Sequence, residues 1–148
     1  MSRRVLHPTD FSRASAPAFA RALAEAKQQR SELLVAHVMA PVIPLAGAGE
    51  GYMSPAVYEQ MTESARAWAQ KQMGRLLAKA KAARVRVRGL VLEGIAHEQI
   101  VRTAKRQGAG LIVMGTHGRT GVARFFLGSV AARVAATAPC PVLTVRGR

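Results

Sequence analysis

Residues 115–130 read GTHGRTGVARFFLGSV, and this glycine-containing segment decides how the rest of the sequence is interpreted. Four apolar residues, 111–114 (LIVM), precede it and are typical of a buried strand, whereas residues 130–135 (VAARVA) are typical of a helix. A strand that ends in a glycine loop and continues into a helix is an arrangement that cradles phosphate groups. The segment therefore indicates a phosphate site, with a plain strand-to-helix connection as the alternative.

Three glycines and a serine give this segment its chemistry. Gly115, Gly118 and Gly128 let backbone N–H groups approach an anion with no Cβ in the way. Ser129 places a hydroxyl at the expected helix N-terminus, where unsatisfied N–H groups and the positive end of the helix dipole also point. Because the spacing is G-x2-G-x9-G-S, the segment is neither a P-loop nor a G-x-G-x-x-G turn.

Two arginines inside the same segment favour an anionic ligand. Arg119 and Arg124 would add charge-assisted hydrogen bonds to phosphate oxygens. Asp10 and Gly115 both follow the ends of apolar strands, so in a parallel sheet they face the same edge, where ligands of such sheets bind. The Asp10 carboxylate then either accepts hydrogen bonds from a ligand or only caps the following turn.

The G-x2-G-x9-G-S spacing resembles the nucleotide-binding signature of the universal stress protein (UspA) family, ATP-binding type. Residues 5–12 (VLHPTDFS) are similar to the first strand and loop of that family, and residues 138–145 (APCPVLTV) are similar to its last strand. His7 departs from the pattern, because the family usually has an aliphatic residue there. The resemblance covers nearly the whole chain and implies a Rossmann-like α/β fold with a single open parallel five-stranded sheet in the order 3-2-1-4-5.

The alternation of apolar strands and helices predicts the same fold class from the residues alone. It indicates a parallel sheet flanked by helices on both faces, in a single domain that spans residues 1–148. Strands are expected near residues 4–7, 31–38, 84–92, 111–114 and 142–145, with helices between them. The second helix is predicted to start at Ser54 and Pro55 and to bury Trp68 in the core, and the third helix is predicted to end at Gly108.

One expected strand has an unusual pattern of charge. Residues 84–88 (RVRVR) alternate arginine with valine, so one face of this strand is basic. A central strand under helices does not tolerate three arginines on one face, which predicts either an edge strand or a strand whose first half protrudes from the sheet. The implied strand order agrees with an edge strand. Contact of these arginines with a polyanion is a secondary interpretation. Residues 39–54, rich in proline and glycine, are expected either to fold over a ligand or to form a loop without such a role.

The resemblance implies that the cofactor is ATP, with Mg or Mn as an accompanying cation. The positions that match the nucleotide-binding pattern of the family are Pro8, Thr9, Asp10, Val38, Met114, Gly115, His117, Gly118, Arg119, Gly128, Ser129 and Val130. In that pattern, Asp10 and the backbone of Val38 hold the nucleoside, and the glycines surround the phosphates. The resemblance also implies a homodimer through the last strand and a role in stress response through nucleotide-dependent partner contacts.

Composition limits the other functions. The chain has 22 Lys and Arg against 8 Asp and Glu, so a net charge of +14 predicts non-specific attraction to polyanions. Its single cysteine and the absence of a signal-like or membrane-spanning stretch predict a cytoplasmic protein. The histidines show no metal-ligand spacing and no catalytic constellation is recognised, so slow ATP hydrolysis is the most activity expected. The alternatives are a nucleotide-free interaction protein of the same fold and a basic nucleic-acid-associated protein.

Overall fold

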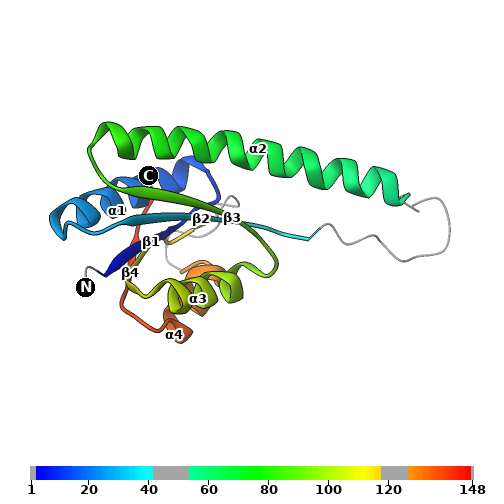
Figure 1. Ribbon diagram of the computed structural model, residues 1–148. Helices are drawn as coiled ribbons and strands as arrows, with labels where there is room; N and C mark the ends of the chain where they lie inside the picture. The colour runs from blue at the N-terminus through cyan, green and yellow to red at the C-terminus, as the bar shows by residue number, and fades with distance from the viewer. Residues whose placement is uncertain (1–2, 42–53, 118–126, 148) are drawn as a thin grey trace.

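A computed structural model describes residues 3–41, 54–117 and 127–147 of the chain (Figure 1). Five parallel strands form one sheet in the order β3-β2-β1-β4-β5, which confirms the predicted fold class and strand order. The strands are β1 (Arg4–Pro8), β2 (Leu33–Met39), β3 (Val87–Glu93), β4 (Ala109–Gly115) and β5 (Val142–Val145). The predictions for Gly118, Arg119, Arg124 and residues 42–53 lie outside the described residues.

Helices cover both faces of the sheet (Figure 1). They are α1 (Ala16–Gln28), α2 (Pro55–Ala82), α3 (Ala96–Gln107) and α4 (Ser129–Thr137), with a short 3-10 turn, η1 (Arg13–Ser15), before α1. Helices α1 and α2 lie on one face, where the core includes Val5, Leu33 and Phe19. Helices α3 and α4 lie on the other face, where the core includes Leu6 and Leu34. Successive strand residues thus enter opposite cores, as expected for strands buried on both faces.

The ends of the helices follow the local signals in the sequence. Helix α2 begins at Pro55, and the hydroxyl of Ser54 accepts a hydrogen bond from the Val57 N–H at 3.4 Å. Gly108 ends α3 with a φ of +62°, a left-handed conformation that glycine adopts without a Cβ penalty. These ends confirm the predicted start of the second helix and the predicted stop of the third.

The first half of α2 corrects the prediction that Trp68 is a core residue. Helix α2 extends well past the edge of the sheet (Figure 1), and its buried residues, Ala69, Met73 and Ala80, all lie in its second half. Trp68 is 42% exposed, and Val57 and Met61 are also exposed. The apolar pattern predicted the helix correctly, but it gave no information on how far the sheet reaches beneath it.

Strand β3 lies at the edge of the sheet, as the arginine pattern predicted. The strand itself begins at Val87, later than expected, so Arg84 and Arg86 lie in the connection from α2. Arg84 has a φ of +60° and continues the end of α2 instead of starting a strand. Only Arg88 of the three arginines is a strand residue, and its side chain contacts Glu32 and Gln107.

Candidate functional site

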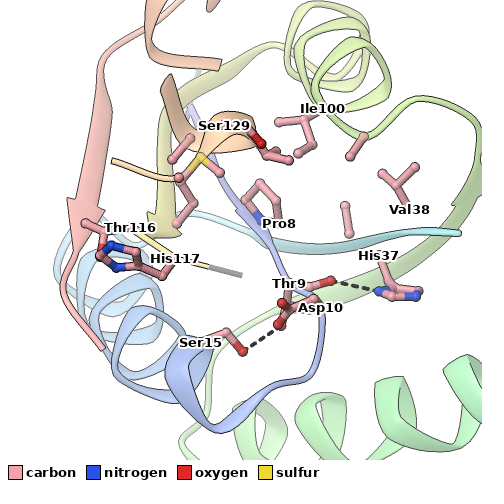
Figure 2. A pocket seen from close by; sticks show the side chains of 17 residues that line it. Pro8, Thr9, Asp10, Ser15, His37, Val38, Ile100, Thr116, His117 and Ser129 are labelled. Carbon is pink, nitrogen blue, oxygen red and sulfur yellow. Dashed lines mark hydrogen bonds between the residues drawn. The ribbon is translucent and has the colours of Figure 1, made fainter. Parts of the chain in front are cut away.

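A cavity of about 300 Å³ lies beyond the carboxyl ends of β1 and β4 (Figure 2). This volume is at the lower end of the range for small-ligand sites. Every predicted site residue that the structure describes lines it: Pro8, Thr9, Asp10, Val38, Met114, Gly115, His117, Gly128, Ser129 and Val130. The structure also adds residues that the sequence did not identify: Ser15, Ala36, His37, Ala96, Ile100, Thr116 and Ala131.

Strand order explains why these distant segments meet. Strand β1 pairs with β2 on one side and with β4 on the other, so the chain order reverses between β1 and β4. In open parallel sheets such a reversal leaves a crevice at the carboxyl ends of the two strands, because their helices leave toward opposite faces. Asp10 follows β1 and Thr116 follows β4, and both therefore reach this crevice.

Hydrogen bonds fix the loop between β1 and α1. The Ser15 hydroxyl donates to the Ser12 carbonyl at 2.7 Å, so its contact with the Thr9 hydroxyl at 3.1 Å requires Thr9 to be the donor. The Thr9 oxygen in turn accepts the Phe11 N–H at 3.0 Å. One oxygen of Asp10 accepts the Ser12 N–H at 2.9 Å. The turn-capping role that the sequence left open for Asp10 is therefore present, while the same residue also lines the cavity.

Three adjacent backbone N–H groups at the start of α4 have no hydrogen-bond acceptor among the described residues. They belong to Ser129, Val130 and Ala131, each of which lines the cavity. The first intrahelical bond of this end joins the Ala132 N–H to the Gly128 carbonyl at 2.9 Å. Together with the positive end of the helix dipole, these N–H groups form an anion-binding arrangement.

Gly128 lines the cavity and also joins the start of α4 to the end of β4. Its own N–H donates to the Thr116 carbonyl at 2.7 Å and is therefore already used. A Cβ at residue 128 would lie 2.8 Å from the same carbonyl oxygen, closer than real Cβ contacts allow. Glycine is needed here because the start of α4 packs directly against the end of β4.

His37 is a cavity residue that the sequence analysis missed. Its Nδ1 donates to the Thr9 carbonyl at 2.8 Å, which joins the end of β2 to the end of β1 (Figure 2). The ring centroids of His37 and Phe11 are 4.6 Å apart. Trp68 packs edge-on against Phe11, with their ring centroids 5.7 Å apart. The available signal was a histidine within an otherwise apolar strand, directly before the predicted site residue Val38.

The aromatic contacts account for an unusual backbone conformation. Phe11 has a φ of +62°, which costs a residue with a Cβ roughly 1–2 kcal/mol. Its ring is held by His37 and Trp68, and its N–H is held by Thr9. Outliers of this kind persist where the surrounding structure fixes them, which occurs often at ligand sites.

His117 lines the cavity from the segment after β4. Its Nδ1 lies 2.8 Å from the Thr116 hydroxyl, while its Nε2 is buried without a partner in the described part of the chain. An unpartnered buried ring nitrogen in a cavity is available to a ligand, because leaving it unsatisfied is costly.

His7 is fully buried beside the site without lining the cavity. Its Nδ1 donates to the Val113 carbonyl at 2.8 Å, and its ring centroid lies 5.7 Å from that of Phe19. Burial lowers the pKa of His7 to about 4, although the Val113 carbonyl and Asp10 oppose this change. His7 is therefore neutral at pH 7 and part of the core.

The described residues offer no ready-made metal centre, since they contain no group of three His, Cys, Asp or Glu side chains placed to hold an ion. Among the same residues, no helix is both long and apolar enough to cross a membrane. The thiol of Cys140 is partly buried, and burial raises its pKa, so it is a poor nucleophile.

Both the sequence and the fold of the chain are similar to those of known proteins. The universal stress protein family model matches residues 1–146. Universal stress protein MJ0531 of Methanocaldococcus jannaschii is 34% identical over 146 residues, covering 97% of this chain and 82% of that protein. A universal stress protein of Thermus aquaticus is 36% identical over 146 residues, covering 99% of this chain and all of that protein.

Solved structures have the same fold. The hypothetical protein MJ0577 superposes with a TM-score of 0.86 at 26% identity, covering 100% of this chain and 98% of that one. A universal stress protein in complex with cAMP superposes with a TM-score of 0.70 at 24% identity, covering 99% and 98%. A universal stress protein from Archaeoglobus fulgidus in complex with dAMP has a TM-score of 0.64 at 20% identity, covering 99% and 100%.

Proposed function

Because this chain belongs to the universal stress protein family, we propose that it binds ATP in the cavity at the carboxyl ends of β1 and β4. The observation that carries the proposal is the row of three N–H groups at the start of α4, in the same cavity as the Asp10 carboxylate. The row of N–H groups suits phosphate, and the Asp10 carboxylate suits the hydroxyl or amino hydrogens of a nucleoside. Relatives of the same fold in complex with cAMP and dAMP support an adenine nucleotide.

The phosphates would lie at the N-terminus of α4. The N–H groups of Ser129, Val130 and Ala131 supply donors that require no side-chain movement, and the Ser129 hydroxyl adds another. Because Gly128 is used to pack α4 against β4, it would hold these donors in place instead of contacting the phosphates itself. Gly118 and Arg119 stay predictions for the same phosphate group.

The nucleoside would lie between the ends of β1 and β2. Asp10 would accept hydrogen bonds from ribose hydroxyls or from the adenine amino group, and the Val38 backbone would contact the base. Ile100 and Met114 add apolar lining to the same cavity. His37 would act as a positioning residue, because it fixes the ends of β1 and β2 relative to each other.

A divalent cation such as Mg or Mn would be held in this site mainly by the bound nucleotide. Since the described residues form no cation centre of their own, phosphate oxygens would supply most of the coordination. Asp10 is the carboxylate of the cavity lining. The cation would neutralise phosphate charge, and no catalytic step is assigned to it.

Binding, and not turnover, is the proposed activity. A role in stress response would then follow from a difference in partner contacts between the nucleotide-free and the nucleotide-bound protein. A homodimer through β5 is part of the proposal, because β5 ends the sheet and its outer edge pairs with no described strand. Light scattering with and without Mg-ATP would measure both the dimer and its dependence on nucleotide.

The test is calorimetric titration of Mg-ATP into wild type, Ser129→Glu and Ala135→Glu. Ser129 is exposed at the first position of α4, where an acidic residue stabilises a helix while it repels phosphate. Ala135 is an exposed residue later in the same helix and gives the matched control of charge. We expect binding by wild type and Ala135→Glu and loss of binding by Ser129→Glu, with the melting temperature of Ser129→Glu unchanged or raised.

Two results would overturn the proposal. Absence of ATP binding by wild type would favour a nucleotide-free interaction protein of the same fold. Equal binding by all three proteins would place the nucleotide elsewhere, for instance on the basic surface. A Gly128→Glu variant is unsuitable for this test, because any Cβ at that residue collides with the Thr116 carbonyl whether or not ATP is present.

A further inference from the structure

The end of the sheet opposite the cavity collects the positive charge of the chain. Every strand starts there and α1, α2 and α3 end there, so their connections lie side by side at the left of Figure 1. We name this surface the basic pole and define it as residues 3–4, 27–30, 79–88 and 105–106. These segments hold half of the 22 lysines and arginines of the chain and contain no Asp or Glu.

Neighbouring acids neutralise little of this charge. Glu25 pairs with Arg21 at 2.7 Å, outside the basic pole. Glu32 pairs with Arg4 at 2.7 Å and with Arg88 at 3.5 Å. No described carboxylate lies within ion-pair distance of the remaining lysines and arginines of the pole, and all of these side chains are exposed.

Helix ends account for the lysines but not for two arginines. Lys27, Lys79 and Lys105 lie in last turns, where a cation interacts favourably with the negative end of the helix dipole. Arg30 and Arg84 instead have φ values of +52° and +60°, just past the ends of α1 and α2. The equivalent position after α3 is a glycine, Gly108, with a φ of +62°.

The hydrogen bonds identify both arginine positions as Schellman ends, where glycine is the usual residue. The Ser31 N–H donates to the Ala26 carbonyl at 2.9 Å around Arg30, and the Val85 N–H donates to the Ala80 carbonyl at 3.0 Å around Arg84. Arginine in this backbone conformation destabilises the fold relative to glycine. The two charges are therefore present at a cost in stability, which indicates a role outside folding.

The chemistry of the basic pole selects the kind of anion. Arginine predominates in it, and its planar guanidinium matches phosphate oxygens with two parallel hydrogen bonds. The segments of the pole contain no aromatic residue on which a single-stranded base would stack. Large exposed apolar side chains, which a membrane-inserting surface requires, are described elsewhere: Val57, Met61, Trp68, Ile95 and Leu127.

We propose that the basic pole binds the phosphate backbone of double-stranded nucleic acid without sequence preference. Arg30 and Arg84 contact phosphates in this complex, and the surrounding lysines and arginines extend the contact across adjacent connections. The pole and the cavity lie at opposite ends of the strands, so this binding is independent of the proposed nucleotide site.

The test is fluorescence anisotropy of a labelled DNA duplex of about 20 base pairs, titrated with protein at several salt concentrations. Each phosphate contact contributes about −0.9 to the slope of log K against log salt concentration. Replacing two contacting arginines should therefore make the slope shallower by about 1.8. If the variant and wild type bind equally at about 1 M salt, the variant should then bind about 60-fold more weakly than wild type at about 0.1 M salt. The variant is Arg30→Gly with Arg84→Gly, and the control with equal charge is Arg102→Gln with Arg133→Gln.

Glycine makes the variant informative, because it suits both backbone positions and should raise the melting temperature while DNA binding falls. We expect the control pair, on exposed faces of α3 and α4, to bind DNA nearly as tightly as wild type. With ionic strength and free Mg held constant, ATP should leave the wild-type affinity unchanged.

Three outcomes would overturn the proposal. In the first, wild type does not bind the duplex at about 0.1 M salt. In the second, the two charge-matched variants lose the same amount of DNA affinity. In the third, the protein binds vesicles with anionic lipid as tightly as DNA, with the same dependence on Arg30 and Arg84. The second outcome would assign the attraction to net charge alone, and the third would assign it to anionic surfaces in general. None of them depends on whether ATP binds in the cavity.

Discussion

Lowering the pH from 7 to 4 should destabilise this protein through one buried imidazole, that of His7. The side chain is fully buried, donates from Nδ1 to the Val113 carbonyl, and leaves Nε2 without a partner among the described residues. Protonation would place a charge and a second N–H donor where no acceptor is described. The folded protein therefore resists protonation of His7, whereas the unfolded chain does not.

The magnitude follows from the two pKa values. Burial lowers the pKa of His7 from 6.5 to about 4 in the folded protein. Between these values the unfolded chain binds more protons, so the stability contributed by neutral His7 is complete above pH 6.5 and is lost as the pH falls toward 4. A difference of about 2.5 pKa units corresponds to about 3 kcal/mol at 1.36 kcal/mol per unit.

The assay is urea unfolding of wild type and His7→Val at pH 7 and pH 4, with His97→Gln as the histidine control. Carboxylates also titrate over this range, so the informative quantity is the difference between the proteins. Between pH 7 and pH 4, we expect the free energy of unfolding of wild type and of His97→Gln to fall by about 3 kcal/mol more than that of His7→Val. Equal losses in all three proteins would refute the reasoning, since they would show that His7 is protonated as easily in the fold as in the unfolded chain.

Further variants test packing and backbone conformation by denaturant unfolding. Gly128→Ala should lower the free energy of unfolding by about 1–3 kcal/mol, because its Cβ would lie 2.8 Å from the Thr116 carbonyl oxygen; a neutral effect would mean that α4 shifts freely. Trp68→Ala should cost about 1–2 kcal/mol despite its exposure, because the ring packs on Phe11; no loss would show that this contact is unimportant. Arg30→Gly and Arg84→Gly should each stabilise the fold by about 0.5–1 kcal/mol, because glycine suits a positive φ; destabilisation would contradict the assignment of strain.

Much of the fold was predictable because its signals are local. The alternation of apolar strands and helices gave the order of elements, and the arginine pattern of residues 84–88 correctly predicted that β3 lies at the edge of the sheet. Ser54 and Gly108 marked helix ends through capping chemistry that depends on few neighbours. The strand order itself came from the resemblance to the family.

What the sequence did not reveal depends on distant contacts. Trp68 was interpreted as core because helix periodicity does not report where the sheet ends beneath α2. His37 was missed because its partners, Thr9 and Phe11, both come from the loop after another strand, β1. The packing role of Gly128 was not predicted, because only the three-dimensional structure places the Thr116 carbonyl against it.

The most direct test of the central claim is to follow the backbone amide resonances by NMR while Mg-ATP is added. We predict that the amide resonances of Ser129, Val130 and Ala131 shift most, since these groups are the proposed phosphate donors. Amides of the basic pole, such as that of Arg84, should change little. Shifts confined to the basic pole, or no shifts at all, would contradict a nucleotide site at the start of α4.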